Sequence, residues 1–262
     1  MSEEKNNNPH LQEIRDFWNH RAGMGKWAGT NDIIAKQLEI KTIATYARDG
    51  IKVLDFGCGN GITAIEIARQ FDVQLLGMDY AEEMIIAANG LIKGQALKGK
   101  VKFQVGDVDS LSTLNQKFDL IYTERMLINL PDWPAQKEAI IRLTKLLQPG
   151  GQYVMCENSE DGLDAINDLR EPAGLEKVVP PWHNRYLKDR EINSLKIQDV
   201  NLEGINHFSS TYYFLSRVVN AWLAKQDGKE PSYDALVNQL ALLLPSFEKF
   251  GQGKIWLWRK TG

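Results

Sequence analysis

Residues 53–61 read Val-Leu-Asp-Phe-Gly-Cys-Gly-Asn-Gly, and an alternation of strands and helices begins there. The apolar run Lys52–Asp55 indicates a buried strand, and the glycines that follow indicate a turn into a helix over 62–71. Glycine lets the backbone approach a ligand closely, and the first N–H groups of a helix are free to meet a ligand acceptor. A turn that only reverses the chain does not need three glycines in five positions. The stretch therefore predicts a ligand-binding turn at the carboxyl end of a strand.

The alternation continues along the chain. Further strands are predicted over 73–78, 101–105, 118–122, 153–156, 197–208 and 254–258. Further helices are predicted over 81–89, 134–147, 160–169, 188–195, 211–224 and 233–244. Upstream, Asn8 is expected to cap a helix that begins at Pro9, and Thr30 a second helix that ends near Gly50. Strands that alternate with helices form right-handed βαβ units, so we expect an α/β fold with a Rossmann-like, seven-stranded, mostly parallel sheet flanked by helices.

The composition excludes several classes of protein. With 43% apolar and 25% charged residues it is that of an ordinary globular chain. The formal charge of −3 lacks the positive footprint of a nucleic-acid-binding protein, so nucleic acid is not an expected partner. Two cysteines cannot build a disulfide framework or a four-cysteine zinc site, which favours the cytoplasm. Neither the polar N-terminus nor the short apolar stretch 240–244 indicates export or a membrane span.

Two classes of ligand compete for the glycine turn. Dinucleotide-binding enzymes use G-x-G-x-x-G, in which the third glycine falls three places after the second. Here that place is Ile62, and the pattern is G-x-G-x-G. Asp55 before the turn would repel a pyrophosphate, whereas it suits a ligand that carries an ammonium and a sulfonium. An NAD(P)-dependent oxidoreductase is therefore the less favoured alternative.

The stretch 53–61 resembles the first motif of class I S-adenosylmethionine-dependent methyltransferases of the small-molecule type. The resemblance continues in order over about the next 100 residues, the extent of one such sheet. Four later stretches carry it: Leu75–Asp79, Val101–Val108, Phe118–Thr123 and Leu146–Gly151. Five pieces in the right order make the signal specific, although no single piece does.

The resemblance implies S-adenosylmethionine as the cofactor. Asp79, 18 residues after Gly61, is the acid that would bind the ribose hydroxyls, and Asp107 would contact the adenine. Taken alone, Asp79 could cap a helix and Asp107 could close a turn. The expected cofactor contacts are Trp18, Arg21, Asp55, Gly57, Gly59, Gly61, Asp79, Tyr80, Met84, Asp107, Val108 and Thr123.

One methyltransferase domain is expected over 1–262. Residues 1–50 would form a helical cover, 51–158 the cofactor-binding core, and 159–262 the half that faces the substrate. The helices within about 211–245 lie between the last two strands, where a minimal α/β sheet does not need them. We expect this insert to cap the site.

The resemblance implies a small or medium-sized methyl acceptor. Residues 129–132, Asn-Leu-Pro-Asp, are not the Asn/Asp-Pro-Pro-aromatic box of enzymes that methylate base amino groups. Glu124 is followed by Arg125, which disfavours a magnesium site, so no metal is expected. Oxygen is the first expected acceptor atom, and nitrogen or carbon are alternatives. A non-catalytic S-adenosylmethionine-binding subunit is a further alternative, and a homodimer stays open.

A hydroxyl or a protonated amine must lose a proton during methylation, whereas a carboxylate is already anionic. His183 and His207 are the candidate general bases, because imidazole titrates near neutral pH. Arginines could also bind an anionic acceptor. The expected acceptor contacts are Arg125, Arg185, Tyr186, Tyr212, Tyr213 and Arg217.

Overall fold

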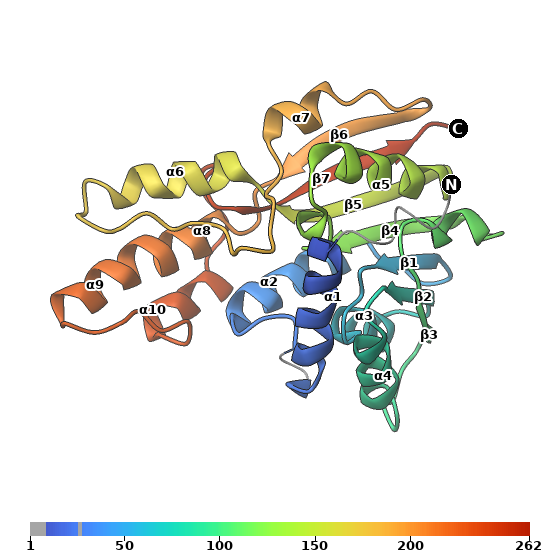
Figure 1. Ribbon diagram of the computed structural model, residues 1–262, viewed down its shortest axis with the longest axis horizontal. Helices are drawn as coiled ribbons and strands as arrows, with labels where there is room; N and C mark the ends of the chain where they lie inside the picture. Colours follow the sequence, from blue (N-terminus) through green and yellow to red (C-terminus); the bar gives the residue numbers. More distant parts are fainter. Residues whose placement is uncertain (1–8, 26–27) are drawn as a thin grey trace.

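A seven-stranded sheet runs through the part of the chain that the computed structural model describes, residues 9–25 and 28–262 (Figure 1). The strand order is β3-β2-β1-β4-β5-β7-β6. The strands are β1 (Lys52–Phe56), β2 (Gln74–Asp79), β3 (Lys100–Val105), β4 (Phe118–Glu124), β5 (Leu147–Asn158), β6 (Val200–Asn206) and β7 (Gly253–Lys260). Neighbours from β3 through β5 pair in parallel, and β7 pairs antiparallel with both β5 and β6. The expected mostly parallel sheet is confirmed.

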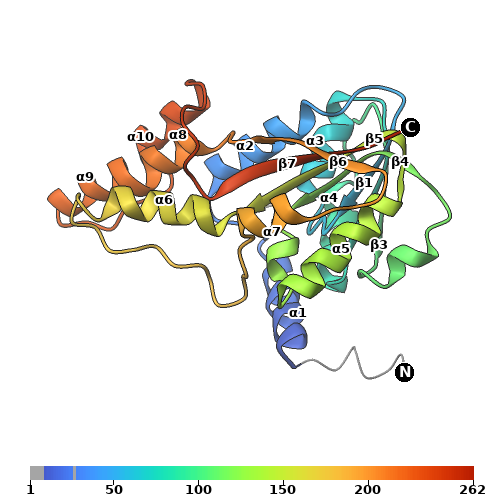
Figure 2. The same cartoon turned by 90° about the horizontal axis from the view of Figure 1, so that it is seen from above.

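Helices cover both faces of the sheet (Figure 2). They are α1 (Pro9–Ala22), α2 (Ile33–Ala44), α3 (Ile62–Gln70), α4 (Glu82–Leu91), α5 (Trp133–Lys145), α6 (Glu160–Arg170), α7 (Asp189–Ser194), α8 (Ser210–Tyr213), α9 (Asn220–Gln226) and α10 (Leu236–Gln239). Because side chains alternate along a strand, Val53 packs with α2, α3 and α4, and Leu54 packs with α5 and α7 on the other face. Buried alternate faces explain why β1 reads as a continuous apolar run.

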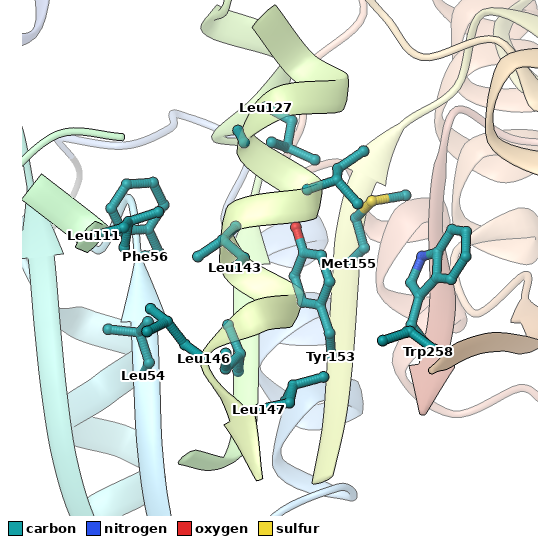
Figure 3. Packing of buried hydrophobic residues seen from close by; sticks show 14 of the residues in the cluster. Leu54, Phe56, Leu111, Leu127, Leu143, Leu146, Leu147, Tyr153, Met155 and Trp258 are labelled. Carbon is teal, nitrogen blue, oxygen red and sulfur yellow. The ribbon is translucent and has the colours of Figure 1, made fainter. Parts of the chain in front are cut away.

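The α5 face of the core is shown in Figure 3. Leu143 on α5 lies over the strands, between Leu54 and Phe56 of β1 and Tyr153 of β5. Leu143 and Tyr153 are fully buried. This packing fixes β1 and β5 relative to each other, and the ends of these strands hold the site described below.

The cap of α2 differs from the expectation, and the expected cap of α1 lies outside the described residues. Asp32, not Thr30, caps α2, since its carboxylate accepts a hydrogen bond from the Ala35 N–H at 3.1 Å. The hydroxyl of Thr30 instead accepts from the N–H of Asp32 at 3.0 Å. A carboxylate is the stronger acceptor for the exposed N–H groups of a helix start, which explains the choice. Asn8, the expected cap of α1, lies outside the described residues.

The insert before β7 departs from the predicted pair of regular helices. The first helix is continuous but contains a π-helical segment, Phe214–Val219, between α8 and α9. The second shrinks to α10 and a 3₁₀ turn over Leu240–Leu242. Leu236 and Leu243 are both 81% exposed, so little burial stabilises a longer helix there. Figures 1 and 2 show the insert beside α6, beyond the carboxyl ends of the parallel strands.

Smaller shifts occur at two strands. Residues 197–199 and 207–208 fall outside β6, and β5 begins at Leu147 rather than at Tyr153. Gly150, with φ of 77°, lets β5 continue through the Pro-Gly-Gly stretch that precedes the predicted strand. Within the described residues, no helix combines the length and apolar character that crossing a bilayer requires.

Candidate functional site

A cavity of about 820 Å³ lies at the carboxyl ends of the parallel strands. Its walls come from α1, α2, the glycine turn after β1, the ends of β2, β4 and β5, the loop 181–184 and the insert. The order of the strands reverses between β1 and β4. Ligands of open α/β sheets bind at this kind of reversal, because the connections on either side of it diverge and leave a crevice.

The three glycines of the turn have positive φ angles, 82° at Gly57, 53° at Gly59 and 75° at Gly61. A Cβ at Gly57 would collide with the side chain of Met126, and a Cβ at Gly61 would collide with the ring of Phe103. These two glycines therefore allow close packing, and Gly61 does not line the cavity. At Gly59, no atom of the described residues lies within 4 Å of an added Cβ. Gly59 thus presents bare backbone to the cavity.

Asp79 ends β2 and joins the glycine turn to the start of α4. Its carboxylate accepts hydrogen bonds from the N–H groups of Gly59 at 2.8 Å and Ala81 at 2.9 Å. Burial raises the pKa of Asp79, and the two backbone hydrogen bonds oppose that change. Each carboxylate oxygen can accept more than one hydrogen bond, so a carboxylate that lines the cavity can still receive two neighbouring hydroxyls. This donor set fits a ribose.

The other walls of this end fit an adenine. Met84 and Val108 supply apolar surface, and Tyr80 lies beside them in the lining. Asp107 also lines the cavity, and one oxygen of its carboxylate accepts from the Ser110 N–H at 3.0 Å, which closes the turn after β3. Together with Asp79 and Gly59, these residues fit S-adenosylmethionine.

Helix α1 covers the same end. Trp18 lines the cavity, and its Nε1 donates to Oδ1 of Asn129 at 3.1 Å. Arg21 lines it too, and its Nε donates to the carbonyl of Ala28 at 2.7 Å. We call the part of the cavity between Asp79 and α1 the cofactor end.

Asp55 and Thr123 do not line the cavity, contrary to the expectation. The carboxyl of Asp55 accepts from the Tyr122 hydroxyl at 2.8 Å, and burial raises its pKa to about 8. The hydroxyl of Thr123 bonds to that of Tyr153 at 3.0 Å. Both residues precede the ends of their strands, so their side chains point into the helix-covered faces of the sheet rather than beyond its edge.

The opposite part of the cavity, the acceptor end, lies beneath the insert. It is lined by Arg125, Asn158, Tyr186, Tyr213, Arg217, Tyr233 and Gln252. Arg217, in the π-helical segment, donates to a carboxylate oxygen of Asp32 at 2.9 Å. Its guanidinium also lies 4.8 Å from the ring centroid of Tyr233. Gln252 donates to the hydroxyl of Tyr186 at 3.1 Å.

Four of the six expected acceptor contacts thus line the cavity, and two do not. Arg185 instead pairs with Glu191 at 2.6 Å. The hydroxyl of Tyr212 donates to Asp32 at 2.5 Å. A sequence does not show which partner a charged or hydroxyl-bearing side chain finds, because these partners come from distant segments.

Of the two candidate histidines, one lines the cavity and the other does not. His183 lines the cavity, and its ring lies 4.5 Å from that of Phe17 between centroids. Burial, with a smaller effect from Arg21, lowers its pKa. His207 does not line the cavity. It follows β6, the edge strand beyond β7, where burial and the charge of Lys254 lower its pKa.

An ionic cluster in the lining was missed from the sequence. Lys36 pairs with Glu124 at 2.6 Å, and Arg125 pairs with Glu39 at 3.2 Å. Thr63 also donates to Glu124 at 2.6 Å. Asp32, Lys36 and Glu39 recur at helical spacing on the buried side of α2, and that pattern of polar residues was the available signal.

Arg125 has a φ of 53°, unusual for a residue other than glycine. Its N–H donates to the carbonyl of Cys156 at 2.9 Å. This bond and the ion pair to Glu39 hold the residue in a costly conformation, as often happens at functional sites.

Comparison with known proteins agrees with this geometry. The model of the methyltransferase domain family matches residues 53–151. Norajmaline N-methyltransferase and ajmaline N-methyltransferase, both from Rauvolfia serpentina, are 31% and 36% identical to the chain over 121 residues. Each alignment covers 46% of this chain and 40% of the relative, so the chain matches less than half the length of either.

Solved structures share the fold. An S-adenosylmethionine-dependent methyltransferase from Clostridium acetobutylicum superimposes with a TM-score of 0.54 at 17% identity, over 90% of this chain and 94% of that one. Magnesium protoporphyrin IX methyltransferase from Synechocystis, with bound SAH, gives 0.54 at 15% identity, over 87% and 84%. Residues 53–151 thus match the methyltransferase domain family, and the chain shares its fold with these S-adenosylmethionine-dependent methyltransferases.

Proposed function

We propose that this protein transfers the methyl group of S-adenosylmethionine to a small-molecule acceptor. The observation that carries the proposal is the continuity of the cavity, which runs from Asp79 at the cofactor end to Tyr213 and Arg217 at the acceptor end. The reversal of strand order between β1 and β4 lies between the two ends. Residues 1–50 then act as a cover, 51–158 as the cofactor core and 159–262 as the substrate side of one unit. A homodimer and a cytoplasmic location stay predictions.

S-adenosylmethionine supplies a methyl group on a sulfonium whose leaving group is neutral. The protein therefore contributes mainly alignment and the exclusion of water. Asn129 supports both, because its Oδ1 accepts from Trp18 of α1 at 3.1 Å and from Nδ2 of Asn184 at 3.3 Å. The contact joins α1 to the loop 181–184, and both segments line the cavity. Asn129 is thus a positioning residue for the cover.

We propose nitrogen ahead of oxygen as the acceptor atom. The two Rauvolfia relatives are N-methyltransferases by name, and so is phosphoethanolamine N-methyltransferase 3 of Arabidopsis thaliana, 34% identical over 110 residues. In the cavity, Arg125 pairs with Glu39, Arg217 with Asp32 and Lys36 with Glu124. Cations that already have carboxylate partners bind an anionic acceptor weakly, so this balance favours a neutral or amine-bearing acceptor.

Calorimetry and a turnover assay test the proposal. S-adenosylhomocysteine should bind the protein and NADH should not, whereas binding of NADH alone would establish the oxidoreductase alternative. Release of S-adenosylhomocysteine is then measured with matched panels of amines, phenols and carboxylates. The amines are expected to react fastest. Cofactor binding without transfer to any panel would favour the non-catalytic subunit.

A further inference from the structure

Glu39 of α2 is a buried acid in the cavity that no established role explains. The residue is 3% exposed, yet it belongs to the cavity lining. Its Oε2 lies 3.2 Å from the Arg125 guanidinium, but no donor among the described residues makes a hydrogen bond to it. A buried carboxylate oxygen with an unused lone pair is costly unless a ligand uses it.

The surroundings of Glu39 place a proton on it. Glu124 at the end of β4 already accepts from Lys36 of α2 and Thr63 of α3. Glu39 and Glu124 are hydrogen-bonded to each other, and two carboxylates in contact retain one proton between them. Lys36 and Thr63 both donate hydrogen bonds to Glu124 and stabilise its ionised form, so the shared proton lies on Glu39.

Among the described residues, burial and Glu124 favour the proton on Glu39, and together they outweigh Arg125 and Lys36, which oppose it. Burial raises the pKa of Glu39 to about 8, Arg125 opposes that change and Glu124 adds to it. Burial also acts to raise the pKa of Glu124, but the charge of Lys36 and the hydrogen bond from Glu39 outweigh it and lower that pKa. Tyr213 of α8 and Cys156 of β5 face the same carboxyl, and burial raises the pKa of both groups, so both stay neutral.

We propose that Glu39 is the catalytic base that removes a proton from the methyl acceptor. This proposal rests on the function proposed above. The acid lies next to Arg125, which lines the acceptor end of the same cavity. In the step, the acceptor atom forms a bond to the methyl carbon, and the carbon–sulfur bond breaks with its electron pair on sulfur. The acceptor proton goes to the Glu39 carboxylate and then to water when the product leaves. His183 is then not required as the base.

The ionisation of Glu39 should follow the charge of the cofactor. With the proton on Glu39, the cluster of Lys36, Glu39, Glu124 and Arg125 has one net positive charge. A sulfonium bound nearby favours loss of that proton, because opposite charges attract strongly at low dielectric. The neutral thioether of S-adenosylhomocysteine has no such effect. Glu39 would therefore be ionised when the methyl donor is present and protonated after transfer.

This difference can be measured without knowing the acceptor. Calorimetric titrations of the full chain, in two buffers with different heats of ionisation, give the protons released on binding S-adenosylmethionine and S-adenosylhomocysteine. The amino group common to both ligands cancels in the comparison. At pH 7.5 we expect S-adenosylmethionine to release about half a proton more, and its affinity relative to S-adenosylhomocysteine to rise up to about tenfold from pH 6 to 9.

Three variants make the test specific. Glu39→Gln should bind both ligands without the proton difference, whereas Glu39→Asp should retain it. Glu157→Gln is the matched control, because Glu157 is 1% exposed and burial raises its pKa to about 7, but it does not line the cavity. This control should keep the difference of the unchanged protein.

The outcomes separate the two proposals. A proton difference that persists in Glu39→Gln, or that disappears in Glu157→Gln, would overturn the role of Glu39 and leave methyl transfer intact. The same conclusion follows if both ligands bind the unchanged protein with equal proton release. If neither ligand binds, the proposed function fails and this inference fails with it.

Discussion

Replacement of Asp79 by alanine tests the placement of the cofactor. The carboxylate makes two hydrogen bonds to backbone N–H groups, from Gly59 at 2.8 Å and from Ala81 at 2.9 Å. A hydrogen bond to a charged group contributes about 1.5–3 kcal/mol. Water from the cavity can replace part of this loss, so we expect the free energy of unfolding to fall by about 2–4 kcal/mol.

Cofactor affinity should fall as well. A charge-assisted hydrogen bond to a ribose hydroxyl contributes about 1.5–3 kcal/mol, so its loss should raise the dissociation constant of S-adenosylhomocysteine roughly 10- to 150-fold. Calorimetry at a temperature where the variant is folded measures that constant, and circular dichroism checks the fold. Asp164→Ala is the control, because Asp164 is exposed on α6, lies outside the cavity lining and carries the same charge. Unchanged affinity in a folded Asp79→Ala variant would refute the placement of the ribose.

Three further predictions concern the core, the buried acid and the histidines. Leu143→Ala should lower the free energy of unfolding by about 2–5 kcal/mol in urea titrations, because it empties the fully buried contact between α5 and the sheet, and a loss below about 1 kcal/mol would contradict that packing. Burial raises the pKa of Asp55 to about 8, above its value in the unfolded chain, so ionisation of Asp55 costs stability as the pH rises from about 4 to 8. Between pH 5 and pH 8, the free energy of unfolding from urea titrations should therefore fall by about 1–3 kcal/mol less in Asp55→Asn than in the unchanged protein. If it falls equally in both proteins, Asp55 is not the titrating group. His183→Ala should change the Michaelis constant for the acceptor, while His207→Ala, outside the cavity, should leave turnover unchanged; the reverse pattern would move the acceptor end to β6.

Local patterns predicted the strand, the glycine turn and the helix that line up in β1 and α3. The strand, the glycines and the next helix are contiguous, so their geometry follows from nearby residues alone. Asp79 could be placed because the carboxyl ends of neighbouring parallel strands meet at one edge of the sheet. The same reasoning failed for Asp55 and Thr123, since a motif gives the strand that a residue occupies but not whether its side chain reaches beyond the edge.

Patterns were weaker in the insert and the cap of α2. The apolar residues of 233–244 have a helical spacing, but Leu236 and Leu243 are largely exposed, and an unburied stripe does not stabilise a long helix. Both Thr30 and Asp32 are suitable capping residues. The backbone path brings the Asp32 carboxylate, the stronger acceptor, to the free N–H groups, and the sequence does not show that path.

The sequence by itself determined the order of strands and helices, the glycine turn and the acid that ends β2, because each depends on residues close together in the chain. Tertiary structure decided the acceptor end. Asp32 and Arg217 form an ion pair across 185 residues, and Glu39 meets Glu124 and Arg125 only because α2 packs against the end of β4. Periodicity shows which face of a helix is buried, but it does not show which distant side chain lies opposite. Only the folded molecule therefore shows that His183 lines the cavity and His207 does not, and where Glu39 lies in it.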